Sequence, residues 1–138
     1  MYRIRKKLKF EMAHILEGAY SKCCSDTIHG HSYEVELFFE SPELNADGMV
    51  IDFGEIKQMT AELVNRYDHA LLVPISLSAE QHLALKTFNK KLRVVKYNPT
   101  AENMAHEIFD VVRSYFPLLR RVRLHETDTG YAEYSEGL

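Results

Sequence analysis

Residues 29–40 read HGHSYEVELFFE, and their side chains alternate between two kinds. Every second position is apolar or carries an imidazole, while most of the positions between them are Ser or Glu. The first set comprises His29, His31, Tyr33, Val35, Leu37 and Phe39. A period of two is the period of a β-strand with one buried face. The stretch therefore predicts a strand whose buried face begins with two histidines.

The chain before this strand shows the same alternation over residues 2–14. Its apolar parity holds Ile4, Leu8, Phe10, Met12 and His14, and its polar parity holds Arg3, Arg5, Lys7, Lys9 and Glu11. Because this polar face is basic and that of residues 29–40 is acidic, an antiparallel pair would form cross-strand ion pairs. The basic stripe over residues 3–9 is therefore interpreted as a solvated sheet face rather than as a polyanion site.

Two long amphipathic helices are predicted further along the chain. The first begins at Asp52, which together with Glu55 resembles a capping box. Its apolar residues then recur at helical spacing up to Tyr67. The second helix begins at Thr100, carries one apolar face and ends before Pro117.

Shorter elements complete the expected fold. A capped short helix is predicted over about residues 78–89, and a β-rich run over residues 92–97. Two more strands are predicted over residues 121–126 and 131–134. The order strand–strand, helices, strand–strand predicts an α+β fold, in which a four-stranded antiparallel sheet carries two long helices on one face.

Length and composition limit the possible classes of function. The chain of 138 residues is expected to form a single domain over residues 1–138, and its 46% of hydrophobic residues can supply a core. A net charge of -3 gives no reason to expect a nucleic-acid partner. No apolar stretch reaches the roughly 18 residues of a membrane span, and no apolar segment typical of a secretory signal follows the basic N-terminus. The two adjacent cysteines do not suit a disulfide scaffold, so a reducing cytoplasm is the expected location.

Three histidines form the first candidate site. His29 and His31 project from the same face of their strand, and His14 ends the preceding strand on its apolar parity. Three imidazoles on one face suit zinc in its catalytic form, with the fourth coordination position left for water or substrate. The alternative is that each is a core histidine satisfied by its neighbours. The histidines that lack such partners in the pattern are expected at the surface: His82, His106 and His125.

Two further features carry possible chemistry. Glu126 shares the inward parity of Val122 and Leu124, and a buried carboxylate is costly unless it is paired or bound to a ligand. It could accept two N–H bonds from a planar heterocycle, or it could pair with an arginine. Asp68 and His69 follow the end of a helix, where they could be a carboxylate-oriented imidazole or a polar loop.

Six motifs then occur in a characteristic order. They are FEMAH (10–14), HGHSYEVEL (29–37), DGMVIDFGEIK (47–57), YDHALL (67–72), NPTAENMAHEIF (98–109) and LHETDTGYAEY (124–134). In this order and spacing the chain resembles, over nearly its whole length, the family of 6-pyruvoyltetrahydropterin and 6-carboxytetrahydropterin synthases. The resemblance implies the tunnelling fold, an antiparallel sheet with two long helices that assembles into rings. It also implies a homo-oligomer, commonly a hexamer of two trimers, with active sites between subunits.

The resemblance assigns roles to the candidate residues. It implies zinc as the cofactor, a pterin as the small-molecule partner and 7,8-dihydroneopterin triphosphate as the substrate. Asp68 and His69 match an acid/base pair that reaches a neighbouring subunit's site, and Glu126 matches the carboxylate that anchors the pterin. The implied zinc ligands are His14, His29 and His31, and the implied lining of the pterin pocket includes Thr100 and Glu102.

The catalytic thiol departs from the family pattern. The carboxy type has its cysteine four residues before the first histidine of HGH, where this chain has Ser25. The pyruvoyl type has it six residues before, which is Cys23, whereas Cys24 matches neither spacing. We predict Cys24 as the catalytic thiol and keep Cys23 as the alternative. The connection over residues 74–97 is also longer than in compact members, which could change the substrate mouth or the contacts between subunits.

The expected function is that of a zinc-dependent lyase. It would convert 7,8-dihydroneopterin triphosphate to 6-carboxytetrahydropterin, with release of acetaldehyde and triphosphate, in a queuosine-type pathway. One alternative is 6-pyruvoyltetrahydropterin synthase, which eliminates triphosphate only. An alternative of another class is a non-catalytic zinc- or pterin-binding module, but binding alone would need neither a thiol nor the imidazole of His69. A cupin-like metal barrel would not contain two long amphipathic helices.

Overall fold

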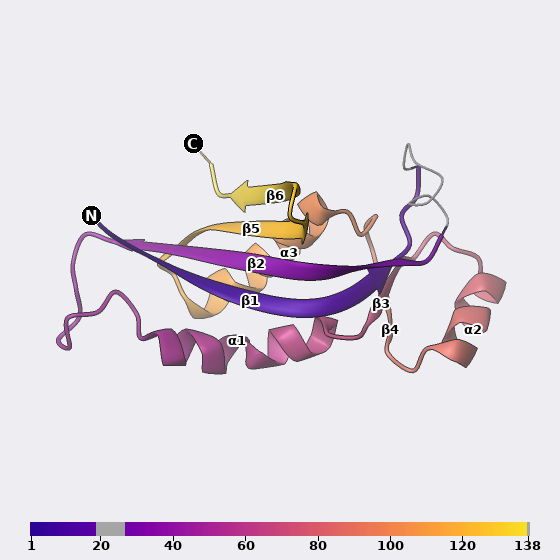
Figure 1. Ribbon diagram of the computed structural model, residues 1–138, viewed down its shortest axis with the longest axis horizontal. Helices are drawn as coiled ribbons and strands as arrows, with labels where there is room; N and C mark the ends of the chain where they lie inside the picture. Colours follow the sequence, from indigo (N-terminus) through magenta and orange to yellow (C-terminus); the bar gives the residue numbers. More distant parts are fainter. Residues whose placement is uncertain (19–26, 138) are drawn as a thin grey trace.

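The computed structural model describes residues 1–18 and 27–137 (Figure 1). Two long strands, β1 and β2, cross the middle of the molecule, and the helices flank them. Cys23, Cys24 and Ser25 lie outside the described residues. The elements are β1 (Tyr2–His14), β2 (His29–Ser41), α1 (Phe53–Tyr67), β3 (Leu71–Pro74), α2 (Ala79–Phe88), β4 (Leu92–Val95), α3 (Ala101–Tyr115), β5 (Leu119–Thr127) and β6 (Gly130–Ser135).

The described strands form one six-stranded sheet in the order β4-β3-β1-β2-β5-β6. The predicted four-stranded antiparallel sheet is its larger part, from β1 to β6, but the predicted strand number was too low. Strand β3 pairs in parallel with the end of β1, and β4 pairs in parallel with β3. All four residues of β3 are buried, so the strand shows no alternation that a sequence pattern could reveal.

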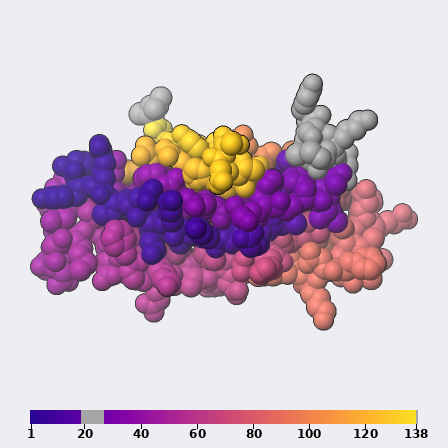
Figure 2. Space-filling model, viewed as in Figure 1, coloured from indigo at the N-terminus to yellow at the C-terminus, as the bar shows by residue number. Residues whose placement is uncertain are grey.

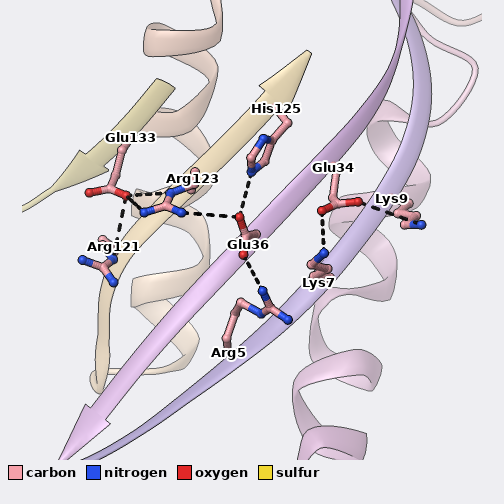
Figure 3. Close-up of polar contacts among 9 residues, drawn as sticks. All are labelled: Arg5, Lys7, Lys9, Glu34, Glu36, Arg121, Arg123, His125 and Glu133. Carbon is pink, nitrogen blue, oxygen red and sulfur yellow. Dashed lines mark hydrogen bonds and ion pairs between the residues drawn. The ribbon is translucent and has the colours of Figure 1, made fainter. Parts of the chain in front are cut away.

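The predicted cross-strand ion pairs are present on the outer face of the sheet, the face away from the long helices. Strands β1 and β2 pair antiparallel along their whole lengths, with Lys9 opposite Glu34. Lys7 Nζ lies 2.8 Å from a carboxylate oxygen of Glu34, and Arg3 Nε lies 3.0 Å from one of Glu40 (Figure 3 draws the first of these pairs). The basic stripe is therefore a solvated sheet face whose cations are matched by the acidic strand beside it.

Glu36 is the buried centre of this outer network. Arg5 donates to one of its oxygens at 2.9 Å, and His125 Nε2 donates to the other at 2.7 Å, from the opposite side (Figure 3). Arg123 lies 3.8 Å away and also pairs with Glu133. His125, which was expected at the surface, is partly buried beside Glu36, because its strand β5 pairs with the neighbouring strand β2.

The core lies between the inner face of the sheet and the two long helices. The apolar parities of β1 and β2 contribute Phe10, Tyr33 and Leu37, while α1 contributes Ile56 and α3 Ile108. Both predicted long helices are present and carry the buried stripes that their spacing indicated. Figure 2 shows the atoms of β1 and β2 across the front of the molecule, with the α1 segment packed along the lower side.

Side chains cap each of the three helices. Asp52 caps α1 by accepting from the N–H two residues ahead at 2.7 Å, rather than through the box with Glu55 that the sequence resembled. Ser78 and Gln81 form the reciprocal capping box of α2, and Thr100 caps α3. Among the described residues, no helix combines the length and the apolar character that a bilayer span requires.

Candidate functional site

The register of β1 and β2 brings three histidines together at one end of the hairpin. His14 lies directly opposite His29, and His31 lies opposite Met12, two residues before His14. The ring centroid of His14 lies 4.4 Å from that of His29 and 5.2 Å from that of His31. The centroids of His29 and His31 are 5.1 Å apart. One ring nitrogen of each residue lies within 4.8 Å of the other two. Three side chains predicted from parity alone thus meet at one point.

Hydrogen bonds select the free nitrogen of these rings. His14 Nδ1 lies 2.8 Å from the carbonyl oxygen of Pro99, and His29 Nδ1 lies 3.1 Å from that of Thr27. Because a carbonyl only accepts, Nδ1 carries the proton in both rings and Nε2 keeps its lone pair. The Nε2 atoms of all three histidines are buried and have no hydrogen-bond partner within residues 1–18 and 27–137. Three convergent, unpartnered ring nitrogens fit a bound metal ion and do not fit three separately satisfied core histidines.

Burial favours the neutral form of two of these imidazoles. Burial lowers the pKa of His14 to about 4, although its bond to Pro99 opposes the effect. Burial also lowers the pKa of His31, against the opposing charge of Glu126. A neutral ring is the form that coordinates a metal. Burial therefore favours the metal-coordinating form of His14 and His31.

Glu126 faces the three histidines. Its two carboxylate oxygens lie 3.9 Å from His14 Nε2 and 3.9 Å from His31 Nε2. The pairing of β5 with β6 shifts register between His125 and Thr127, and Glu126 lies at this shift, near the end of β5. In the described part of the chain its ion pairs are with these histidines, and the arginine partner considered from the sequence is not among them.

Thr100, Glu102 and Glu126 line one cavity of about 260 Å³. Its walls also include Leu16 and Tyr131. Thr100 is the N-cap of α3 and Glu102 lies in the first turn of that helix, so the helix start presents a hydroxyl and a carboxylate to the cavity. The three residues that the resemblance grouped around a pterin are therefore neighbours in space, although 26 positions of sequence separate the first from the last.

Asp68 and His69 occupy a different place. Asp68 is the C-cap of α1, and its side chain accepts a hydrogen bond from the backbone N–H of Glu11 at 2.9 Å. His69 is largely exposed and lines a second cavity, of about 420 Å³, with Glu11, His31 and Ser32. The structure does not place Asp68 or His69 among the residues that line the 260 Å³ cavity.

Two contacts of the site were missed from the sequence. The carbonyl of Pro99 orients His14, and the hydroxyl of Tyr33 lies 3.3 Å from the same Nδ1 atom. Tyr33 shares the inward parity of His31, so its direction could have been found. A backbone carbonyl leaves no signal in a sequence. The predicted thiols belong to the part of the chain that the structure leaves undescribed.

Comparisons with known proteins show the family to which the chain is similar. A family model described as 6-pyruvoyl tetrahydropterin synthase matches residues 3–137. The 6-carboxy-5,6,7,8-tetrahydropterin synthase of Haemophilus influenzae is 33% identical over 144 residues, which cover 99% of this chain and 100% of the relative. The enzyme of the same name from Rickettsia bellii is 30% identical, over 96% of this chain and 99% of its own.

Solved structures share the fold. An uncharacterized protein from Wolinella succinogenes superposes with a TM-score of 0.81 at 21% identity, covering 99% of this chain and 98% of its own. The 6-pyruvoyl tetrahydropterin synthase of Caenorhabditis elegans superposes with a TM-score of 0.74 at 20% identity, covering 99% of this chain and 96% of its own. These likenesses confirm the predicted α+β tunnelling fold.

Proposed function

The chain belongs to the 6-pyruvoyl tetrahydropterin synthase family, and from this premise we propose that it is a zinc-dependent lyase acting on 7,8-dihydroneopterin triphosphate. The proposed products, formed with the uptake of one water molecule, are 6-carboxytetrahydropterin, acetaldehyde and triphosphate. The observation that carries the proposal is the position of three buried, unpartnered imidazole nitrogens beside a carboxylate that lines a cavity. The names of the relatives, which are 6-carboxytetrahydropterin synthases at full coverage, support the carboxy product.

The metal would be held through the Nε2 atoms of His14, His29 and His31. These three atoms have no hydrogen-bond partner among the described residues, and in His14 and His29 the Nδ1 atom is already bonded to a backbone carbonyl. Three neutral imidazoles are a donor set that zinc accepts with one position left open. The chemistry that bound zinc supplies is Lewis acidity, which makes a C–H bond next to a polarised oxygen easier to deprotonate.

Substrate recognition is assigned to the cavity beside the histidines. Glu126 can accept two N–H bonds from one edge of a pterin ring, and such charge-assisted bonds are short and strong. Thr100 and Glu102 stand at the start of α3 on the wall of the same cavity. A ring held by these groups would extend its side chain toward the histidines, because Glu126 lies 3.9 Å from two of their Nε2 atoms.

Proton transfer is assigned to a thiol and to the Asp68–His69 pair. We propose that the thiolate of Cys24 removes a proton from the substrate side chain, with Cys23 as the alternative base. His69 would return a proton, its imidazole oriented by Asp68, whose Oδ2 lies 3.8 Å from His69 Nε2. Since His69 lines a different cavity from Glu126, we propose that it serves the site of a neighbouring subunit in a trimer-based hexamer. The proposed location of the enzyme is the cytoplasm.

Product analysis tests the proposal. The zinc-loaded protein is incubated with 7,8-dihydroneopterin triphosphate, the pterin products are identified by mass, and acetaldehyde is measured in the same reaction. The carboxy product with an equal amount of acetaldehyde is expected. A pyruvoyl product without acetaldehyde would assign the second activity of the family. Binding of substrate without turnover would favour the non-catalytic module.

A further inference from the structure

A second polar cluster lies away from the histidines, between α1, β4 and α3. Its centre is the carboxylate of Glu107, whose Oε2 accepts hydrogen bonds from the hydroxyl of Tyr67, at 2.6 Å, and from that of Tyr97. Arg93 donates to the other oxygen at 3.2 Å. The proposed chemistry gives no role to these four residues.

Tyr67 is held from several directions. It is the last residue of α1 and is fully buried. Its ring stacks on Phe10 with centroids 5.2 Å apart, and the Arg93 guanidinium lies 4.9 Å from the ring centroid. Burial and the Glu107 carboxylate raise the pKa of Tyr67, so its hydroxyl remains a proton donor at neutral pH. A phenylalanine would fill nearly the same space, so what the hydroxyl adds is the directional hydrogen bond to Glu107.

The residues directly after Tyr67 are Asp68 and His69. His69 has a φ of 60°, and it is the one residue other than glycine with a positive φ within residues 1–18 and 27–137. Side chains with a Cβ atom disfavour this conformation, so neighbouring contacts must maintain it. Its amide donates to the carbonyl of Glu11 at 2.6 Å, and Lys91 donates to the carbonyl of Asp68.

We propose that Glu107, through Tyr67, positions the strained His69 backbone and thereby its imidazole. The hydrogen bond from the Tyr67 hydroxyl to Glu107 fixes the last turn of α1. The contacts with Glu11 then impose the left-handed conformation on His69, two residues further along the chain. Glu107 and Tyr67 are thus positioning residues for the proton donor, and this inference rests on the role of His69 in the proposed function.

Tyr97 provides a matched control. Its hydroxyl donates to the same oxygen of Glu107, but its own chain leads to Asn98 and Pro99 rather than to His69. Because Pro99 holds His14, Tyr97→Phe serves as the control for amide exchange at His69, and its zinc content is measured as well. Tyr67→Phe and Tyr97→Phe therefore each remove one phenol hydroxyl from one carboxylate oxygen. Melting temperatures of both variants measure any general loss of stability.

Two readouts test the positioning role. Amide hydrogen exchange at His69, followed by NMR or by mass spectrometry of peptides, is expected to accelerate by at least about tenfold in Tyr67→Phe and to remain at the wild-type rate in Tyr97→Phe. With the zinc-loaded enzyme and 7,8-dihydroneopterin triphosphate, kcat is expected to fall by about tenfold or more in Tyr67→Phe, with KM and zinc content within about twofold of wild type.

The two readouts separate this inference from the proposed function. Equal exchange at His69 in all three proteins would overturn the positioning role, as would a loss of kcat that is the same in both variants and follows their melting temperatures. A wild-type protein without turnover would contradict the proposed function, and the exchange comparison would then decide the positioning of His69 by itself.

Discussion

The carbonyl oxygen of Pro99 lies 2.8 Å from Nδ1 of His14, across 85 positions of sequence. Pro99 immediately precedes Thr100, the cap of α3, so this bond joins the start of that helix to the end of β1. Because it orients the ring of His14 with Nε2 toward the other two histidines, it ties the start of α3, which lines the 260 Å³ cavity, to the histidine cluster.

The metal site predicts the effect of removing one ligand. His14→Ala should lose most of the bound zinc, because two imidazoles leave a site that binds zinc weakly. Zinc per chain is measured by elemental analysis after dialysis, with circular dichroism to confirm the fold. His106→Ala, which changes an exposed histidine paired with Asp110, is the control and should keep full zinc. Full occupancy in His14→Ala would contradict the assigned ligands.

Glu126 predicts a separation of substrate binding from metal binding. Glu126→Ala should weaken pterin affinity by the ~2–5 kcal/mol typical of removing one partner from a buried charged hydrogen-bonded pair. Zinc content should be unchanged. Titration calorimetry with a dihydropterin, together with zinc analysis of the same samples, measures both. If the zinc content falls while the pterin affinity stays the same, Glu126 is a metal ligand. This is the competing role for Glu126, because its carboxylate oxygens lie 3.9 Å from the Nε2 atoms of two histidines.

The two cysteines predict opposite outcomes for two similar variants. A cysteine near a bound cation has a pKa below its reference of about 8.5, so its thiolate is available as a base. Cys24→Ala should abolish turnover while zinc and pterin binding remain, and Cys23→Ala should stay active. Turnover assays on both variants and on the double variant decide between them. An active Cys24→Ala with an inactive Cys23→Ala would indicate the pyruvoyl-type spacing.

The outer network predicts a dependence of stability on pH. Burial alone would raise the pKa of Glu36, but hydrogen bonds from His125 and Arg5 and the nearby arginine charges outweigh it, so that the pKa is lowered. A carboxyl with a lowered folded-state pKa stabilises the protein above its unfolded value of about 4.5, and this stabilisation is lost as the pH falls through the folded-state pKa.

Glu36→Gln should therefore be less stable than wild type near pH 7, by about 1–3 kcal/mol. The difference should shrink as the pH falls below about 4.5. Denaturant unfolding at several pH values measures it, with Glu40→Gln, which removes an exposed partner of Arg3, as the control. A difference that stays constant down to pH 3 would show that the charge of Glu36 does not stabilise the fold.

The free edges of the sheet predict association. Strands β4 and β6 are the edges of the described sheet, and an unpaired edge favours pairing with another chain. Ring closure removes such edges, and the resemblance to the family implies a trimer-based hexamer, which we therefore expect at micromolar concentration. Light scattering gives the mass directly. A mass equal to one chain would contradict the proposal that His69 acts in a neighbour's site.

Much of the site followed from the sequence because strand geometry is periodic. His14, His29 and His31 met as expected, since residues of one parity share a face and antiparallel pairing places strand ends together. The inward direction of Glu126 followed from the same rule. The two long helices were equally plain, because fifteen residues each are long enough to display an apolar stripe.

Tertiary structure alone decided those contacts that leave no periodic pattern in the sequence. Strand β3 is four buried residues long, too short to show a pattern, and its pairing with β1 depends on the corner at His69. The carbonyl of Pro99 carries no residue-type signal, yet it fixes His14. Tyr67 and Glu107 lie 40 positions apart in the sequence, on two different helices. Only the packing of both helices on one sheet brings the hydroxyl of Tyr67 to the carboxylate of Glu107. Such contacts depend on where distant elements end in space, which the local pattern of a sequence does not encode.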